Sequence, residues 1–176
     1  MNKIKEIEKK YLWHTYKRHD LVLERGKGSY LYDYNGKKYL DFFGGVATCS
    51  IGHGNSKLAN VLKQQAQKLI NASNLFYTKE LAMLAKKLAE LSGLSKCFFS
   101  NSGTEAVEAA IKLARKYTGK HEIISMEHGF HGRTFGSLAA TWKEKIKIPF
   151  CPMLEKFVHI KFNNIEAFKK AIAKNT

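Results

Sequence analysis

The sequence predicts an α/β protein, with a short β-rich segment followed by the start of a mainly parallel α/β domain. Two observations predict this fold class. Strand-like runs flank an Asn35-Gly36 pair near the N-terminus, and beyond Asn55 helical and strand-like patterns alternate along the chain. Strands that are separated by helices of this size imply right-handed crossovers and a mainly parallel sheet. Ligands gather at the carboxyl ends of the strands in such a sheet.

The N-terminal part is predicted to contain one amphipathic helix, a short apolar stretch and then two strand-like runs. These elements are expected at residues 2–16, 21–25, 29–34 and 37–42. The Asn35-Gly36 pair between the last two runs is a strong signal for a two-residue hairpin loop, because both central positions of a type I′ turn need a positive φ. The chain therefore begins with a small unit that is rich in β-structure.

Glycine-rich stretches follow the hairpin, at residues 44–45 and 52–54. They bracket residues 46–51 and indicate backbone that runs close to another segment. We place a domain boundary at this point. Residues 1–45 are predicted to be a helix-and-hairpin segment, and residues 46–176 to be the first part of a larger domain.

Apolar residues recur at helical spacing in two stretches beyond Asn55. Those of the first helix are Leu58, Val61, Leu62 and Leu69. Those of the second are Leu81, Leu84, Ala85, Leu88 and Leu91, and Gly93 ends this helix. Further helices are expected at about 102–117 and 164–173, and strands at about 96–100, 121–126 and 157–160.

Composition places the chain among globular proteins, because 44% hydrophobic residues in 176 are enough for one ordinary core. No apolar run approaches the roughly 20 residues of a membrane-spanning helix, and we expect a cytoplasmic protein that does not bind membranes. The three cysteines, Cys49, Cys97 and Cys151, are far apart and odd in number, which argues against a disulfide framework and a zinc site. His128 and His131 form an isolated pair, so no metal is expected.

The net charge of +15 is the strongest deviation in composition. It is compatible with a nucleic-acid partner or with an acidic protein partner. The lysines are scattered over nearly every predicted helix and turn, however, and form no basic run of the kind that binds nucleic acid. Solvated helix faces are the simpler interpretation, and a nucleic-acid partner is not expected.

A polar turn between a predicted strand and a predicted helix is the first candidate site. Ser102 and Thr104 offer hydroxyl groups there, Gly103 lets a ligand approach the backbone, and the helix contributes its positive end. This arrangement suits a phosphate dianion. The same residues admit a second interpretation, because Ser102 and Glu105 have the spacing of a capping box that needs no ligand.

A second motif follows the strand predicted at 121–126. The carboxyl end of this strand is expected at the same rim of the sheet as the first motif. Phe130 has a ring that can lie against a flat aromatic ligand, and Arg133 can hold a carboxylate through two parallel hydrogen bonds. In the helix after the first motif, Glu108 is expected to pair with Lys112 one turn later. Taken together, the two motifs favour a site for a ligand with a phosphate and an aromatic ring.

These motifs resemble those of the class III pyridoxal-phosphate aminotransferases. Within that family the chain is most similar to the N-terminal part of the acetylornithine aminotransferases. The segments that carry the resemblance are Ser102–Ala106, Phe130–Thr134, Gly28–Asp33, Gly36–Phe42, Gly45–Ala47, Ile51–His53, Ser73–Phe76 and Leu138–Trp142. The resemblance implies the N-terminal part of a fold-type-I pyridoxal-phosphate-dependent transferase, with residues 1–45 in its small domain and 46–176 in its large domain.

The resemblance also implies roles for individual residues. Ser102, Gly103 and Thr104 would hold the phosphate of pyridoxal 5′-phosphate, and Phe130 would stack on its pyridine ring. Arg133 would bind the α-carboxylate of the amino-acid substrate, and Tyr77 would lie near the substrate entrance. The family reaction moves an amino group from an acylated diamino acid, such as N-acetylornithine, to 2-oxoglutarate. Members of the family are homodimers.

The family's Schiff-base lysine lies in a later part of the large domain, which these 176 residues do not include. The resemblance therefore implies no catalytic residue in this chain, and we expect the 176 residues to be inactive alone. Two alternatives stay open. One is a non-catalytic module that binds a phosphate-containing ligand or an acidic partner. The other is a relative that acts in lysine biosynthesis or on ornithine or 4-aminobutyrate.

Overall fold

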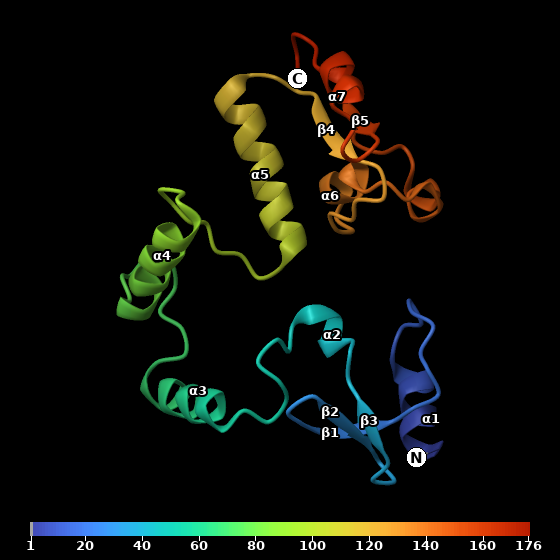
Figure 1. The fold of residues 1–176 in the computed structure, drawn as a ribbon, viewed down its shortest axis with the longest axis vertical. Helices are drawn as coiled ribbons and strands as arrows, with labels where there is room; N and C mark the ends of the chain where they lie inside the picture. The colour runs from blue at the N-terminus through green and yellow to red at the C-terminus, as the bar shows by residue number, and fades with distance from the viewer. Residues whose placement is uncertain (1) are drawn as a thin grey trace. The chain divides into compact units, whose positions relative to one another are not determined.

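The structure is a computed structural model that describes residues 2–176, shown as a ribbon in Figure 1. By its contacts the chain divides into two compact units, Met1–Thr78 and Lys79–Thr176. The first unit contains the predicted N-terminal β-structure, and the second contains both candidate motifs. The predicted domain boundary after residue 45 concerns the domains of the larger fold, and it stays a prediction.

The first unit contains a three-stranded antiparallel sheet with the order β1-β2-β3. Its elements are α1 (Asn2–Tyr11), β1 (Leu23–Lys27), β2 (Tyr30–Asp33), β3 (Lys38–Leu40), α2 (Gly44–Ala47) and α3 (Ser56–Lys68). The two predicted strands are confirmed as β2 and β3, and β1 is a third strand that begins within the stretch 21–25. The first helix is shorter than predicted, because it ends at Tyr11 and the residues that follow, such as His14 and Thr15, are poorer helix formers.

The hairpin between β2 and β3 forms around Asn35-Gly36, but its turn differs from the predicted type. Only Gly36 has a positive φ, of 81°, so the turn is not type I′. The Asp33 carboxylate accepts hydrogen bonds from the backbone N–H groups of Asn35 and Lys37, both at 2.9 Å. The amide of Gly36 donates to the Asp33 carbonyl at 2.9 Å. The aspartate side chain thus favours a longer turn over the two-residue loop.

The second glycine stretch runs close to another segment, as predicted. Gly28 and His53 exchange backbone hydrogen bonds of 2.9 and 2.8 Å. A side chain at Gly52 would meet the backbone of Gly28 at 3.2 Å. The His53 imidazole is hydrogen-bonded to the Asp41 carboxylate, with 2.7 Å between Nε2 and Oδ2. This pair joins the two ends of the segment that contains α2.

The second unit contains two parallel strands among its helices. Its elements are α4 (Lys79–Ser92), α5 (Gly103–Thr118), β4 (Ile123–Met126), α6 (Phe135–Ala140), η1 (Glu144–Ile146), η2 (Ile148–Phe150), β5 (Phe157–Ile160) and α7 (Ile165–Ala171). β4 pairs with β5 in register, from Ile123 opposite Phe157 to Met126 opposite Ile160. The predicted parallel pairing is confirmed, and Figure 1 shows the two strands side by side above α6.

One predicted strand is missing, and the short helical elements α2, α6, η1 and η2 were not predicted. Residues 96–100 have no regular secondary structure, because no neighbouring strand pairs with them in the described part of the chain. Phe98 and Phe99 in this segment are exposed. The short helix α6 has no apolar period of its own, since four of its six residues are glycine, serine or alanine.

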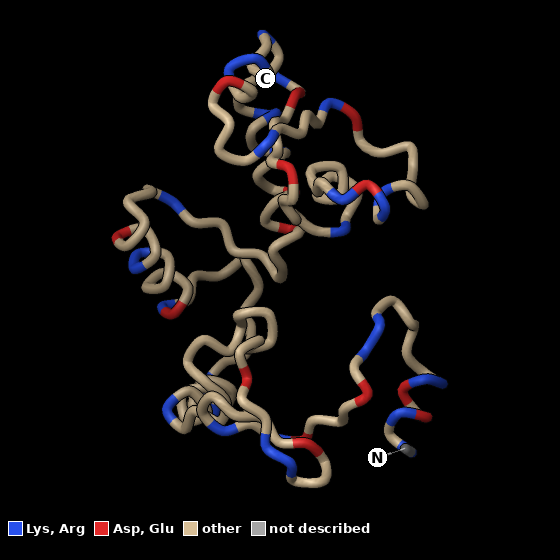
Figure 2. The backbone as a smooth tube through the Cα atoms, turned by 45° about the vertical axis from the view of Figure 1, so that its right-hand side comes forward, with Lys and Arg blue, Asp and Glu red and all other residues tan. Residues whose placement is uncertain are grey.

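The hydrophobic core of the described residues lies in the second unit, where α6 is almost entirely buried. The buried apolar side chains are Ile111, Leu138, Ala139, Ala140 and Ile160. Figure 2 shows Lys and Arg distributed along both units instead of gathered in one run. Within residues 2–176, no helix is both long and apolar enough to span a membrane.

Candidate functional site

The helix α5 begins at the predicted polar turn and is capped there by side chains. Ser102 is the N-cap residue, and its hydroxyl accepts a hydrogen bond from the Glu105 amide at 3.3 Å. The Glu105 carboxylate reaches back and accepts from the Asn101 amide at 2.6 Å. These bonds are close to a capping box, although the carboxylate meets the amide before the N-cap residue. The helix is therefore stabilised at this end by its own side chains.

The cap leaves several amides of the turn open. In the described part of the chain, the backbone N–H groups of Ser102, Gly103 and Thr104 donate to no protein acceptor. The position where a Gly103 side chain would stand is open space. Open amides at the positive end of a 16-residue helix are donors of the kind that bind a phosphate group. The donor set of the turn thus fits a phosphate.

The Thr104 hydroxyl contacts two other hydroxyls. It lies 2.5 Å from Ser137 Oγ and 2.9 Å from Thr134 Oγ1. Gly132 packs directly on it, because a side chain at Gly132 would overlap Thr104 and lie 2.5 Å from Ser137 Oγ. The structure therefore brings the two predicted motifs into contact, with Gly132 between them.

Glu108 is positioned differently from the prediction. No Glu108–Lys112 ion pair forms among the described residues. The Glu108 carboxylate instead accepts hydrogen bonds from the Thr134 hydroxyl at 2.5 Å and from the Ser137 amide at 3.0 Å. The prediction was wrong because it considered only partners on the same helix. The Thr134 hydroxyl and the amides of Ser137 and Gly136 are distant in sequence, and all three donate to this one carboxylate.

The pKa of Glu108 lies below its ordinary value. Desolvation by burial alone would raise this pKa. The hydrogen bonds from Thr134, Ser137 and Gly136, helped by the charge of Lys112, favour the ionised form and outweigh that effect. Glu108 is therefore a carboxylate whose negative charge is held against α6.

Phe130 and Arg133 lie together on the loop after β4. The Phe130 side chain is 63% exposed. The Arg133 guanidinium carbon lies 5.8 Å from the centre of its ring. Thr141, which is buried, fixes this loop: its hydroxyl accepts from the His131 amide at 2.9 Å and donates to the Gly132 carbonyl at 3.3 Å. An exposed ring and a cation are thus held beside the turn of α5.

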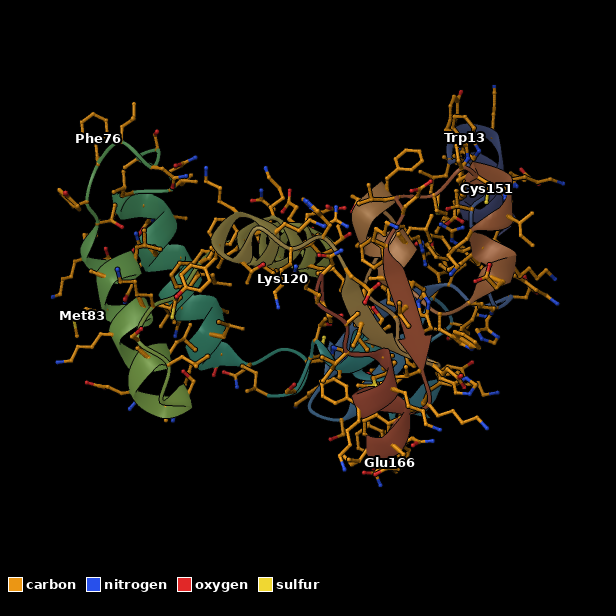
Figure 3. All side chains as sticks on the ribbon, turned by 90° about the horizontal axis from the view of Figure 1, so that it is seen from above. Trp13, Phe76, Met83, Lys120, Cys151 and Glu166 are labelled. Carbon is orange, nitrogen blue, oxygen red and sulfur yellow. The ribbon has the colours of Figure 1, made fainter. Side chains whose placement is uncertain are left out.

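Tyr77 belongs to the first unit, in the loop between α3 and α4, where it is fully exposed. Figure 3 shows its neighbour Phe76 extending outward from the same loop. The structure gives Tyr77 no partner that would test its predicted role. Within residues 2–176, no three His, Cys, Asp or Glu side chains gather where they could hold a metal ion.

Two functional candidates escaped the sequence interpretation, Ser137 and Thr141, and a third, Glu108, was assigned to another partner. Ser137 and Thr141 are almost completely buried, and every polar contact that they make connects segments around α6. The only signal in the sequence was the density of small and hydroxyl residues between Gly132 and Thr141. Such density indicates close packing but does not identify the partners.

Comparison with known proteins identifies related families and structures. The family described as aminotransferase class-III matches residues 12–175. The acetylornithine aminotransferase of Archaeoglobus fulgidus is 50% identical over 171 residues, which are 97% of this chain and 46% of that protein. The acetylornithine aminotransferase of Methanocaldococcus jannaschii is 49% identical over 177 residues, with 97% and 44% covered. The chain thus spans a little under half the length of these relatives.

Solved structures have the same fold. The ornithine aminotransferase of Toxoplasma gondii, whose active site holds pyridoxal phosphate at partial occupancy, matches 97% of this chain and 42% of its own, with a TM-score of 0.90 and 25% identity. The adenosylmethionine-8-amino-7-oxononanoate aminotransferase of M. jannaschii matches 96% of this chain and 44% of its own, with a TM-score of 0.86 and 31% identity.

Proposed function

The chain belongs to the class-III aminotransferase family, and from this premise we propose that its second unit supplies one end of a pyridoxal 5′-phosphate site. Enzymes of this family depend on that cofactor. The packing of Gly132 on Thr104 carries the proposal, since it joins an open anion-binding turn to a loop with an exposed ring and a cation. The predicted fold, as the N-terminal part of a fold-type-I enzyme, agrees with the structural neighbours.

We assign the following roles to the residues of this site. The amides of Ser102, Gly103 and Thr104 bind the cofactor phosphate, and Phe130 lies against the pyridine ring. Arg133 binds the α-carboxylate of the substrate through paired hydrogen bonds. When bound, the cofactor supplies the electron sink that loss of the substrate α-proton requires. The residues of this chain orient the two reactants for that step.

The proposed reaction transfers an amino group from N-acetylornithine, or a related acylated diamino acid, to 2-oxoglutarate. The support comes from the relatives at 42–50% identity, each an acetylornithine aminotransferase. The proposal includes a cytoplasmic homodimer, with Tyr77 near the substrate entrance. It also states that these 176 residues do not transaminate by themselves, because the resemblance assigns the Schiff-base lysine to a region that they do not contain.

A chimera tests the proposal. Residues 1–176 are joined to the part of the A. fulgidus acetylornithine aminotransferase that follows the matched region, and glutamate formed from N-acetylornithine and 2-oxoglutarate is measured. We expect amino transfer by the chimera and none by the 176 residues. Arg133→Ala in the chimera should weaken substrate binding by about 2–4 kcal/mol. Arg133→Lys, which keeps the charge and loses the paired geometry, should recover only part of this loss.

Two results would count against the proposal. A folded chimera that binds the cofactor and transfers no amino group from either N-acetylornithine or ornithine would contradict the proposed activity. An Arg133→Ala chimera with unchanged substrate affinity would remove the role of Arg133 and leave the rest of the proposal intact.

A further inference from the structure

Three hydroxyl groups from two segments contact one another, and one of them, that of Thr134, donates to the carboxylate of Glu108. Thr104 belongs to α5, whereas Thr134 and Ser137 belong to the start of α6. Their oxygens lie 2.5 to 2.9 Å apart, and Thr134 donates to Glu108 Oε1 at 2.5 Å. We call these four residues the hydroxyl–carboxylate cluster. It connects the turn proposed to bind phosphate with the segment that follows Arg133.

The carboxylate fixes the direction of the hydrogen bonds that the Thr134 hydroxyl makes. An ionised carboxylate can only accept, so the single hydroxyl proton of Thr134 goes to Glu108. Thr134 Oγ1 can therefore only accept from the hydroxyls of Thr104 and Ser137, which lie at 2.9 and 2.8 Å. The Ser137 hydroxyl has the Thr134 carbonyl as a further acceptor at 3.2 Å, and either hydroxyl can donate in its 2.5 Å contact with Thr104. These contacts hold the Thr104 side chain against α6. The lowered pKa of Glu108 agrees with donation from Thr134 to its carboxylate.

The cluster is also packed without space for adjustment. A side chain at Gly136 would overlap Glu108 Oε2 and lie 2.9 Å from its Oε1, so the carboxylate rests directly on the backbone of α6. Gly132 meets Thr104 and Ser137 with equally little room. Ser137 is completely buried. A displacement of Glu108 is therefore transmitted to both segments.

We infer that Glu108 is a positioning residue, which holds the α5 turn and the loop of Phe130 and Arg133 in the relative placement that binds a phosphorylated pyridine. This inference rests on the proposed function. Removal of the carboxylate leaves the Thr134 hydroxyl and the amides of Gly136 and Ser137 without their acceptor. The Thr104 end of the turn then loses its fixed contact with α6.

The experiment compares the affinities of pyridoxine 5′-phosphate and pyridoxine for the chimera of residues 1–176 with the A. fulgidus remainder, by calorimetric titration. Neither probe has an aldehyde, so neither reacts with lysine side chains. The ratio of the two dissociation constants measures how much the phosphate contributes to binding. Glu108→Ala should lower this ratio about tenfold, as expected for one lost charged hydrogen-bond partner. Glu108→Gln keeps an acceptor oxygen and should recover most of the ratio.

Glu166→Ala is the matched control. Glu166, labelled in Figure 3, is an exposed glutamate on α7 of the same unit. It pairs with Lys169 and makes none of the hydrogen bonds of the cluster. Its removal should leave the ratio unchanged. Thermal unfolding of every variant separates a loss of stability from a loss of phosphate discrimination.

Each result of the titration and of thermal unfolding either supports the inference or overturns it. A lowered ratio in Glu108→Ala, recovered in Glu108→Gln, supports the inference. An unchanged ratio with a lower melting temperature makes Glu108 a structural residue only and overturns it. If Glu108→Ala does not fold, Thr134→Val removes the donor to the carboxylate, and an unchanged ratio in that variant overturns the inference equally. A chimera without substitutions that binds both probes with equal affinity overturns the proposed function together with this inference.

Discussion

Gly132 is the residue at which the two motifs of the site come closest. It has a φ of 131°, and a side chain there would meet Thr104 and Ser137. We expect Gly132→Ala to lower the free energy of unfolding by at least about 2 kcal/mol, from overpacking and backbone strain together. Urea-induced unfolding measures this change.

Gly103→Ala is the control for that substitution. Gly103 lies in the first turn of α5, has open space around its Cβ position, and does not need a positive φ. Alanine there should be neutral or stabilising by up to about 1 kcal/mol. Equal destabilisation by both variants would contradict the close packing of Gly132 on Thr104.

The pKa of Glu108 predicts how stability depends on pH. Its folded-state pKa lies below the ordinary value of 4.5, because hydrogen bonds to the ionised form outweigh the opposing effect of burial. A depressed pKa contributes stability above the unfolded-state pKa, and this contribution is lost as the pH falls through the folded-state value. The stability difference between wild type and Glu108→Gln should therefore be full at pH 7 and shrink below about pH 4.5. A difference that is the same at pH 7 and pH 3 would contradict the assignment.

At the residue scale, local partners were predictable and distant partners were not. The cap formed by Ser102 and Glu105 follows from residues three positions apart. Glu108, in contrast, meets Thr134 and Ser137, which are 26 and 29 positions away. From helix periodicity, only Lys112 could be predicted as a partner of Glu108. The pattern of one chain contains no information on which distant segment packs against a helix.

The start of α5 is the element that separates the two interpretations of the polar turn. Ser102→Asp keeps an acceptor for the Glu105 amide and adds a negative charge where a phosphate is proposed to bind. We expect stability within about 0.5 kcal/mol of wild type and a clear loss of affinity for pyridoxine 5′-phosphate. Ser102→Ala should instead cost about 1 kcal/mol of stability through the lost cap.

The outcome distinguishes a cap from a binding site. If Ser102→Asp binds pyridoxine 5′-phosphate as tightly as wild type does, the turn serves the helix alone. Unfolding curves give the stability, and titrations of the same protein samples give the affinity for pyridoxine 5′-phosphate. A loss of stability is therefore not mistaken for a loss of affinity.

At the element scale, helices with clear end signals were predicted well. Asn55 caps α3 by accepting from the Leu58 amide, and Gly93 ends α4 with a φ of 73°. The segment at 96–100 was predicted as a strand from its apolar residues, yet a strand needs a hydrogen-bonded neighbour. The buried helix α6 was missed because Gly136, Ser137 and Ala139 give no amphipathic pattern. Tertiary packing, and not local sequence preference, determines the secondary structure of both segments.

At the scale of the whole molecule, both units expose many large apolar side chains. Among them are Phe42, Ile70, Leu75 and Tyr117, all at least 85% exposed. This apolar surface favours association.

We therefore expect the 176-residue chain to self-associate in isolation and to bind a dye that reports apolar surface. Sedimentation velocity and dye fluorescence measure the two properties. The chimera with the A. fulgidus remainder should bind far less dye per molecule. A monodisperse monomer with a cooperative unfolding transition and no dye binding would contradict this expectation.

The central claim is that the turn at Ser102–Thr104 is the phosphate end of a pyridoxal 5′-phosphate site. The most direct test is the calorimetric titration of the chimera, with residues 1–176 unchanged, with pyridoxine 5′-phosphate and with pyridoxine. We predict that the phosphorylated compound binds at least about tenfold more tightly, because the open amides of α5 and the helix dipole act on the phosphate. Equal affinities for the two compounds would contradict the claim.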